Sequence, residues 1–102
     1  MRAIKLSRTF NDELAELLAQ GIDRFGAKVV GQKRALVFHT IENFIAHHPV
    51  RPIDPDLGIC AYPLSGAPFI VIYDYDDHVL RVHLIIHAKA DRRLVDLSTV
   101  VW

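Results

Sequence analysis

The sequence predicts an α+β fold: an N-terminal strand, an antiparallel helical hairpin, and then a three-stranded antiparallel meander with the helices on one face of the sheet. Three observations lead to this prediction. Apolar residues recur at helical spacing through the first half of the chain, and a glycine interrupts that spacing at residue 26. After a proline-rich loop, the apolar residues recur at every second position, as in strands. Helices and strands segregated in this way along a chain are typical of an α+β domain.

The first elements are a short strand and a helix. Residues Ala3 to Ser7 alternate apolar and polar side chains, which predicts a half-buried strand. Either Ser7 or Thr9 can cap the helix that follows. Gly26 is placed to end this helix. Its apolar stripe consists of residues three or four positions apart: Phe10, Leu14, Leu17, Leu18, Ile22 and Phe25.

A second helix is predicted from about residue 27 to His48. Pro49 ends it, because the residue before a proline is disfavoured in helical geometry. Since barely a residue or two around Gly26 joins the two helices, they must fold back on each other as an antiparallel hairpin. Arg34 falls on the apolar stripe, whose other members are Val30, Val37, Ile41, Phe44 and Ile45.

Three strands are predicted in the second half of the chain, at residues 59–64, 69–75 and 79–87. Short turns separate them, so neighbouring strands must be antiparallel. In the last strand the alternation predicts that Leu80, Val82, Leu84 and Ile86 face the helices, whereas solvent or a partner contacts the other set: Arg81, His83, Ile85 and His87. The apolar tail from Leu94 to Trp102 is expected to add an edge strand or to dock on a partner.

Composition narrows the class of protein. A chain of 102 residues is expected to form one domain, and its 51% hydrophobic residues are ample for a core. The single cysteine, Cys60, excludes an internal disulfide, and no apolar run resembles a signal peptide or a membrane span, so we expect a cytoplasmic protein. Twelve basic and twelve acidic side chains cancel, which argues against a general binder of nucleic-acid backbones.

Several local sequences, in this order, resemble those of RelE/ParE-type toxins of bacterial type II toxin–antitoxin systems. They are Leu6-Ser7 before the first helix, His48-Pro49 after the second, the strand from Pro68 to Tyr73, and the strand end Ile85-Ile86-His87 before a basic cluster of Lys89, Arg92 and Arg93. The resemblance covers nearly the whole chain and implies that residues 1–102 form one toxin domain. It also implies a cognate antitoxin as partner, ParD-like or similar, and a role such as plasmid stabilisation.

The superfamily contains two activities, the cleavage of mRNA on the ribosome and the inhibition of DNA gyrase. Relatives that cleave mRNA carry lysines on the strand before the central one and an arginine in a Gly-Tyr-Arg-x-x-Tyr stretch, and such cations can stabilise a phosphorane-like transition state. Here the strand at 59–64 has no lysine, and Ile70 occupies the arginine position. The ParE-like activity, inhibition of DNA gyrase, is therefore favoured. A ribosome-dependent ribonuclease and a degenerate, inactive toxin stay open as alternatives.

The resemblance and the predicted faces together assign candidate residues. Target binding is assigned to Arg92, Arg93 and Trp102, since tryptophan and arginine carry much of the energy at interfaces. Antitoxin binding is assigned to Arg81, His83, His87 and Arg34. If the chain were a ribonuclease, the groups available for catalysis would be Arg81, His83, His87 and Arg92.

No metal site, cofactor, membrane contact or sequence-specific nucleic-acid binding by this chain alone is expected. His83 and His87 on one strand lie about 13 Å apart at about 3.3 Å per residue, too far for one ion. The acidic turn at Asp74, Asp76 and Asp77 lacks the glycine and distal glutamate of a calcium loop. Cys60 has no base at a recognisable spacing and is expected to be a small core residue.

Overall fold

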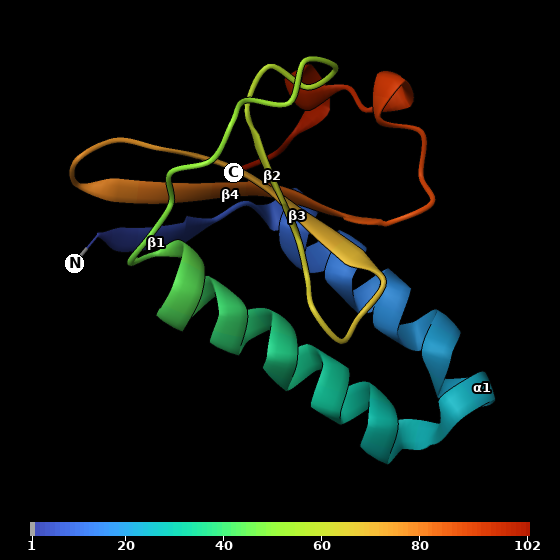
Figure 1. Ribbon diagram of the computed structural model, residues 1–102. Coiled ribbons are helices and arrows are strands. Elements are labelled where there is room, and N and C mark those ends of the chain that lie inside the picture. Colours follow the sequence, from blue (N-terminus) through green and yellow to red (C-terminus); the bar gives the residue numbers. More distant parts are fainter. Residues whose placement is uncertain (1) are drawn as a thin grey trace.

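The computed structural model describes residues 2–102 and confirms the predicted α+β order (Figure 1). Strands β3 and β4 have the predicted bounds, and β2 is one residue shorter at each end than the predicted 59–64. The elements in chain order are β1 (Ala3–Leu6), α1 (Arg8–Thr40), a π-helical turn η1 (Ile41–Ile45), β2 (Cys60–Pro63), β3 (Phe69–Tyr75), β4 (Val79–His87), and two short 3₁₀ turns, η2 (Arg92–Leu94) and η3 (Leu97–Thr99).

The four strands form one sheet in the order β1-β4-β3-β2. Strands β2, β3 and β4 are antiparallel neighbours, as the short turns predicted. Strand β1 lies parallel to β4 at the far edge, with Ala3 opposite Val79. The backbone N–H of Ser7 donates to the Val82 carbonyl at 3.0 Å and so continues this pairing to the start of α1.

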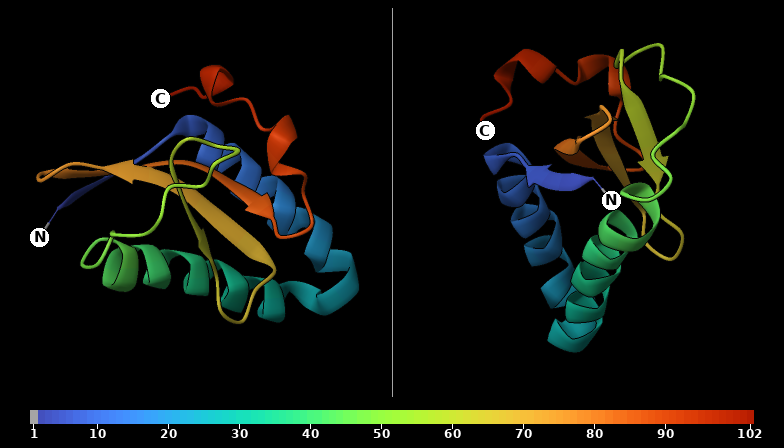
Figure 2. Two further views of the ribbon diagram at one scale, coloured as in Figure 1. Left: turned by 45° about the horizontal axis from the view of Figure 1, so that its top comes forward. Right: turned by 90° about the vertical axis from the view of Figure 1, so that its left-hand side faces the viewer.

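Element α1 is two helical arms joined at Gly26, as the sequence predicted. Gly26 has φ 81° and ψ 161°, a backbone conformation that is essentially restricted to glycine. Ser7 is the residue that caps the first arm, because its hydroxyl accepts the Phe10 N–H at 2.8 Å. The second arm ends in the π-helical turn at Ile45, rather than at the predicted His48. Figure 2 shows the two arms meeting at this turn and diverging toward one face of the sheet.

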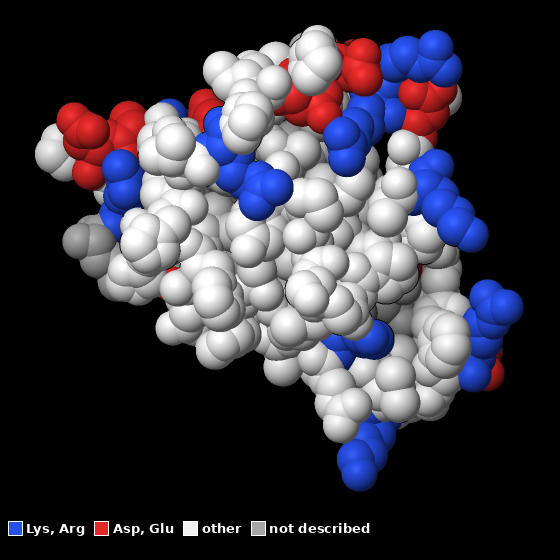
Figure 3. Space-filling model, viewed as in Figure 1, with Lys and Arg blue, Asp and Glu red and all other residues white. Residues whose placement is uncertain are grey.

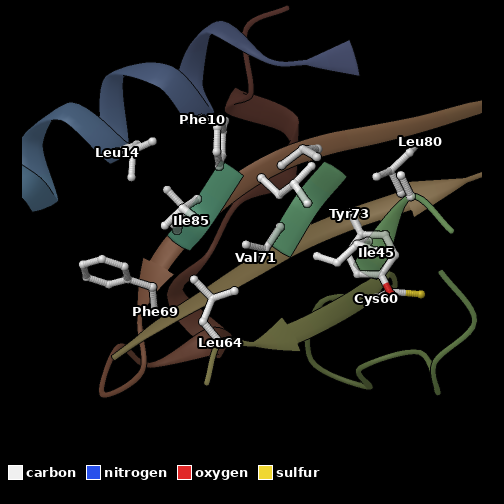
Figure 4. Close-up of a cluster of buried hydrophobic side chains, with 14 of the residues drawn as sticks. Phe10, Leu14, Ile45, Cys60, Leu64, Phe69, Val71, Tyr73, Leu80 and Ile85 are labelled. Carbon is white, nitrogen blue, oxygen red and sulfur yellow. The ribbon is translucent and has the colours of Figure 1, made fainter. Parts of the chain in front are cut away.

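The main core lies between the hairpin and this face of the sheet (Figure 4). Both arms contribute, and Tyr73, whose hydroxyl donates to the Pro49 carbonyl at 2.7 Å, is its largest fully buried side chain. Three residues of the predicted apolar stripes remain exposed: Ile22, Phe25 and Phe44. The buried core residues from the helices and the sheet include Phe10, Leu14, Leu18, Val30, Val37, Ile41, Ile45, Cys60, Phe69, Val71, Leu80, Val82 and Ile85.

Because β4 contains a β-bulge, the predicted faces of this strand are wrong after His83. Ile72 pairs with Leu84 and Tyr73 with Val82, so His83 is an extra residue on β4. Beyond the bulge the alternation is therefore inverted. Ile85 belongs to the core beneath the helices, whereas Leu84 and Ile86, predicted to face the helices, pack on the opposite face.

That opposite face is covered by the C-terminal tail. Val95, Leu97 and Val100 pack on a second buried cluster of Leu57, Ile70, Ile72 and Leu84. The tail was predicted to add an edge strand or to dock on a partner, but it crosses the sheet in two 3₁₀ turns on the side away from the helices (Figure 2). Because its apolar residues complete a core of their own chain, the tail is a third layer of the fold.

Candidate partner and target surfaces

A network of ion pairs holds Arg81 on the sheet face that the tail covers. Its Nε lies 2.8 Å from Asp74 Oδ1, and its Nη1 lies 2.9 Å from Asp76 Oδ2. The hydrogen bond from Arg81, followed by those from the N–H groups of His78 and Val79, holds the pKa of Asp76 well below its usual range. Since two carboxylates offset its charge, Arg81 is a poor candidate for binding a phosphate.

His83 belongs to the seam between the sheet and the tail. Its Nε2 lies 3.2 Å from Asp74 Oδ1, and its ring meets the Trp102 indole edge-on at a centroid distance of 4.7 Å. The ammonium group of Lys5 lies 5.4 Å from the same indole, at a distance typical of a cation–π contact. His83 Nδ1 is buried and has no hydrogen-bond partner among residues 2–102. These contacts make His83 a packing residue of the bulge.

The other two residues assigned to antitoxin binding lie elsewhere. The bulge brings His87 to the helix side of the sheet, where its ring meets Phe69 at 6.5 Å, so the predicted common face with Arg81 and His83 is wrong. Arg34 is exposed on the second arm, with its guanidinium 4.8 Å from the Phe38 ring. The four residues thus occupy three separate places and do not form one surface.

The three residues assigned to target binding are held in different ways. Arg92 Nη1 lies 2.6 Å from Asp54 Oδ2, and the Asp54 side chain is only 8% exposed. Arg93, by contrast, has a side chain that is 77% exposed and pairs with Asp91 of the same turn. Trp102 packs against His83 and is 44% exposed. Arg93 and the exposed part of Trp102 can therefore be reached by a partner, whereas Arg92 ties the tail to the loop before β2.

The alternative ribonuclease site is not assembled. Arg81, His83, His87 and Arg92 would have to converge on one scissile phosphate, but His87 lies on the opposite side of the sheet from His83. Arg81 and Arg92 are each paired with carboxylates. In the part of the chain that the structure describes, no three His, Cys, Asp or Glu side chains gather to hold a metal ion.

Cys60 is a core residue, as predicted. It is buried at the start of β2, and burial is the main cause that raises the pKa of its thiol. A raised pKa leaves the thiol protonated near neutral pH, which makes it a poor nucleophile. Among residues 2–102, no helix has the length and hydropathy needed to cross a membrane.

Sequence reasoning missed a groove at the tip of the hairpin. It lies between the two arms, the turn before β3 and the end of β4, and its lining includes Leu17, Phe25, Val29, Phe69 and His87. One sequence signal marks its rim: the segment from Arg24 to Ile41 carries four lysines or arginines and no acidic residue. We call this feature the hairpin groove.

Comparisons with known proteins agree with the fold. No protein-family model and no curated protein sequence matches the chain. Among solved structures, it is similar to a chain of the structure described as the chromosomal ParDE TA (toxin–antitoxin) system from P. aeruginosa, with a TM-score of 0.73 and 12% sequence identity. The match covers 85% of this chain and 96% of that chain. The protein therefore has a ParE-like fold, as its local sequence resemblance to RelE/ParE toxins led us to expect.

Proposed function

We propose that this protein is the toxin of a type II toxin–antitoxin system, that it inhibits DNA gyrase in the cytoplasm, and that a ParD-like antitoxin neutralises it. The observation that carries the proposal is the structural likeness to a chain of a ParDE system over most of both chains. The dispersed positions of Arg81, His83, His87 and Arg92 favour inhibition by binding over mRNA cleavage, because a nuclease needs its cations and its acid or base at one phosphate.

Induction of the chain alone in bacteria tests this function. A gyrase inhibitor arrests growth with a DNA damage response, and co-expression of the protein encoded beside it restores growth. Purified chain should then inhibit DNA supercoiling by gyrase in vitro. Global mRNA cleavage on ribosomes without DNA damage would support the ribonuclease alternative, and normal growth at a verified level of folded protein would support a degenerate toxin.

The exposed part of the tail is the proposed target contact. Replacing Arg93 with alanine removes a guanidinium that makes only a local, exposed ion pair, so we expect toxicity to fall while the thermal midpoint stays unchanged. Arg8→Ala is the matched control, because Arg8 is equally exposed and its pair with Asp12 is loose at 3.9 Å. If both variants stay fully toxic, the target contact does not include Arg93.

A further inference from the structure

Three prolines lie in the loop between the helical hairpin and β2. Pro49, Pro52 and Pro55 stand at every third position, and we call the segment from Pro49 to Pro55 the proline strap. Each proline fixes its own φ and disfavours helical geometry in the residue before it. The chain accordingly runs extended from Pro49 to Asp54, without a helix or a turn in that segment. Three residues per turn is also the period of the polyproline II helix.

Both ends of the proline strap are fixed to the rest of the fold. At its start, the Tyr73 hydroxyl donates to the Pro49 carbonyl at 2.7 Å. Near its end, the Asp54 N–H donates to the Ile59 carbonyl at 2.9 Å, and the Asp54 carboxylate is paired with Arg92. A segment held in this way has little conformational freedom left to lose when it binds, and such pre-organisation favours affinity.

Between these anchors the proline strap presents large side chains to solvent. Val50 is 78% exposed and Ile53 is 64% exposed. Arg51 is also exposed, and its guanidinium lies 4.6 Å from the centre of the Tyr62 ring. None of the ion pairs among residues 2–102 involves Arg51. The strap crosses the face seen in Figure 3, where the middle is largely uncharged and acidic side chains lie mainly along the upper edge.

The proline strap is continuous with the part of the tail that we propose as the target contact. The ion pair of 2.6 Å between Arg92 and Asp54 joins the two segments, and Figures 1 and 2 show the loop before β2 beside the tail. Arg93 follows Arg92 and is exposed, and the next side chain, Leu94, is 82% exposed. Exposed arginines and apolar side chains on neighbouring segments have the composition of a binding surface: Val50, Arg51, Ile53, Arg93 and Leu94.

From this geometry we infer that the proline strap inserts into a groove of the toxin's protein target, and that this groove is lined with aromatic side chains and rimmed with carboxylates. The inference rests on the proposed function and deepens it by naming the chemistry of the contact. Aromatic-lined grooves bind extended proline-rich segments. Carboxylates at the rim would pair with Arg51, which has no acidic partner among the described residues. A second copy of this chain fits poorly, because a two-fold contact centred on the strap would bring the two copies of Arg51 together.

Affinity for purified DNA gyrase tests the inference with the full chain. Titration calorimetry compares the unmodified chain, the strap variant Arg51→Glu/Ile53→Ser and the control variant Arg8→Glu/Ile22→Ser. The control makes the same two changes at exposed residues of the first arm, away from the strap. Inhibition of supercoiling is measured with the same three proteins, and thermal midpoints check that each is folded.

We expect the strap variant to lose at least about tenfold in affinity for gyrase, because an attractive charge becomes repulsive and an apolar contact is lost with it. Inhibition of supercoiling should weaken by a similar factor. The control variant should bind gyrase like the unmodified chain, and all three proteins should bind the protein encoded beside this chain equally well.

Photo-crosslinking tests the chemistry of the partner groove. Benzoylphenylalanine in place of Val50 should label gyrase, and the labelled peptide should be rich in aromatic and acidic residues. The same amino acid in place of Ala15, which is exposed on the first arm, should not label gyrase. A labelled gyrase peptide without aromatic or acidic residues would overturn the stated groove chemistry.

The outcomes separate this inference from the proposed function. A strap variant that binds and inhibits gyrase as well as the unmodified chain overturns the inference while leaving the toxin function intact. A strap variant that keeps its affinity for gyrase but loses the neighbour-encoded protein assigns the strap to the antitoxin and also overturns the inference. An unmodified chain that neither binds nor inhibits gyrase contradicts both proposals. A crosslink from position 50 to a second copy of the chain, with no label on gyrase, would assign the strap to a dimer.

Discussion

Replacing Gly26 with alanine tests whether the hairpin depends on one backbone conformation. At φ 81° and ψ 161° an alanine costs about 1–3 kcal/mol of backbone strain. A Cβ built at this position meets no atom within 4 Å, so no steric clash adds to that cost. Since each kcal/mol shifts the thermal midpoint by about 4–8 °C in a domain near this size, Gly26→Ala should melt well below the unmodified protein.

Gly31 provides the matched control, because it lies five residues on, inside the second arm. A Cβ there also meets no atom within 4 Å, and its φ is not positive. Gly31→Ala should therefore raise stability by about 0.5–1 kcal/mol through helix propensity. Urea denaturation followed by circular dichroism measures both changes. Equal stability of the two variants would refute the claim that the turn requires glycine, since the same substitution would then have the same effect in both conformations.

Three further predictions concern side chains. Tyr73→Phe should lower the free energy of unfolding by about 1–2 kcal/mol, because it leaves a buried backbone carbonyl without its donor. Burial also raises the pKa of Tyr73, so the unmodified protein should lose stability as the pH rises above about 10, and the variant should lose less stability over the same range. A double-mutant cycle on Asp54→Asn and Arg92→Ala should give a coupling of about 1–3 kcal/mol, and purely additive effects would contradict the tail anchor. The hydrogen bond from Arg81 is the main cause that lowers the pKa of Asp76, so the stability that this carboxylate contributes is present above about pH 4 and is lost in more acid solution. Asp76→Asn should therefore reduce the loss of stability at acid pH. An unchanged loss would count against the ion pair.

The fold was predictable where the pattern of the sequence is local. Helical spacing followed by Gly26 predicted the hairpin, and the short turns on either side of two strand-like segments predicted the bounds of β3 and β4. The face assignment failed after His83, where Leu84, Ile85 and Ile86 form a continuous apolar run. When both faces of a sheet are buried, the residues of such a run can be assigned to either face with equal support from the sequence. The bulge that decides the assignment arises from the pairing of β4 with β3.

The candidate site was harder to predict than the fold. The ion pair between Arg92 and Asp54 joins residues 38 positions apart, so local sequence patterns do not reveal it. Arg92 was therefore assigned to target binding, although it anchors the tail to the loop before β2. His87 changes sides with the bulge for the same reason that Ile85 does. The hairpin groove needs both arms and the turn before β3 in place, and only its basic rim leaves a trace in the sequence.

The parallel pairing of β1 with β4 has a consequence for the order of synthesis. Ala3 can pair with Val79 only after β4 has been made, and the Thr9 hydroxyl can accept the Val101 N–H only 92 positions later in the chain. While the ribosome is still making the middle of the chain, the hairpin can form but its apolar side has no sheet to cover it. Contacts of such long separation also slow folding once the chain is complete. The first half of the chain therefore cannot complete its own fold until the last strand and the C-terminal tail have been made.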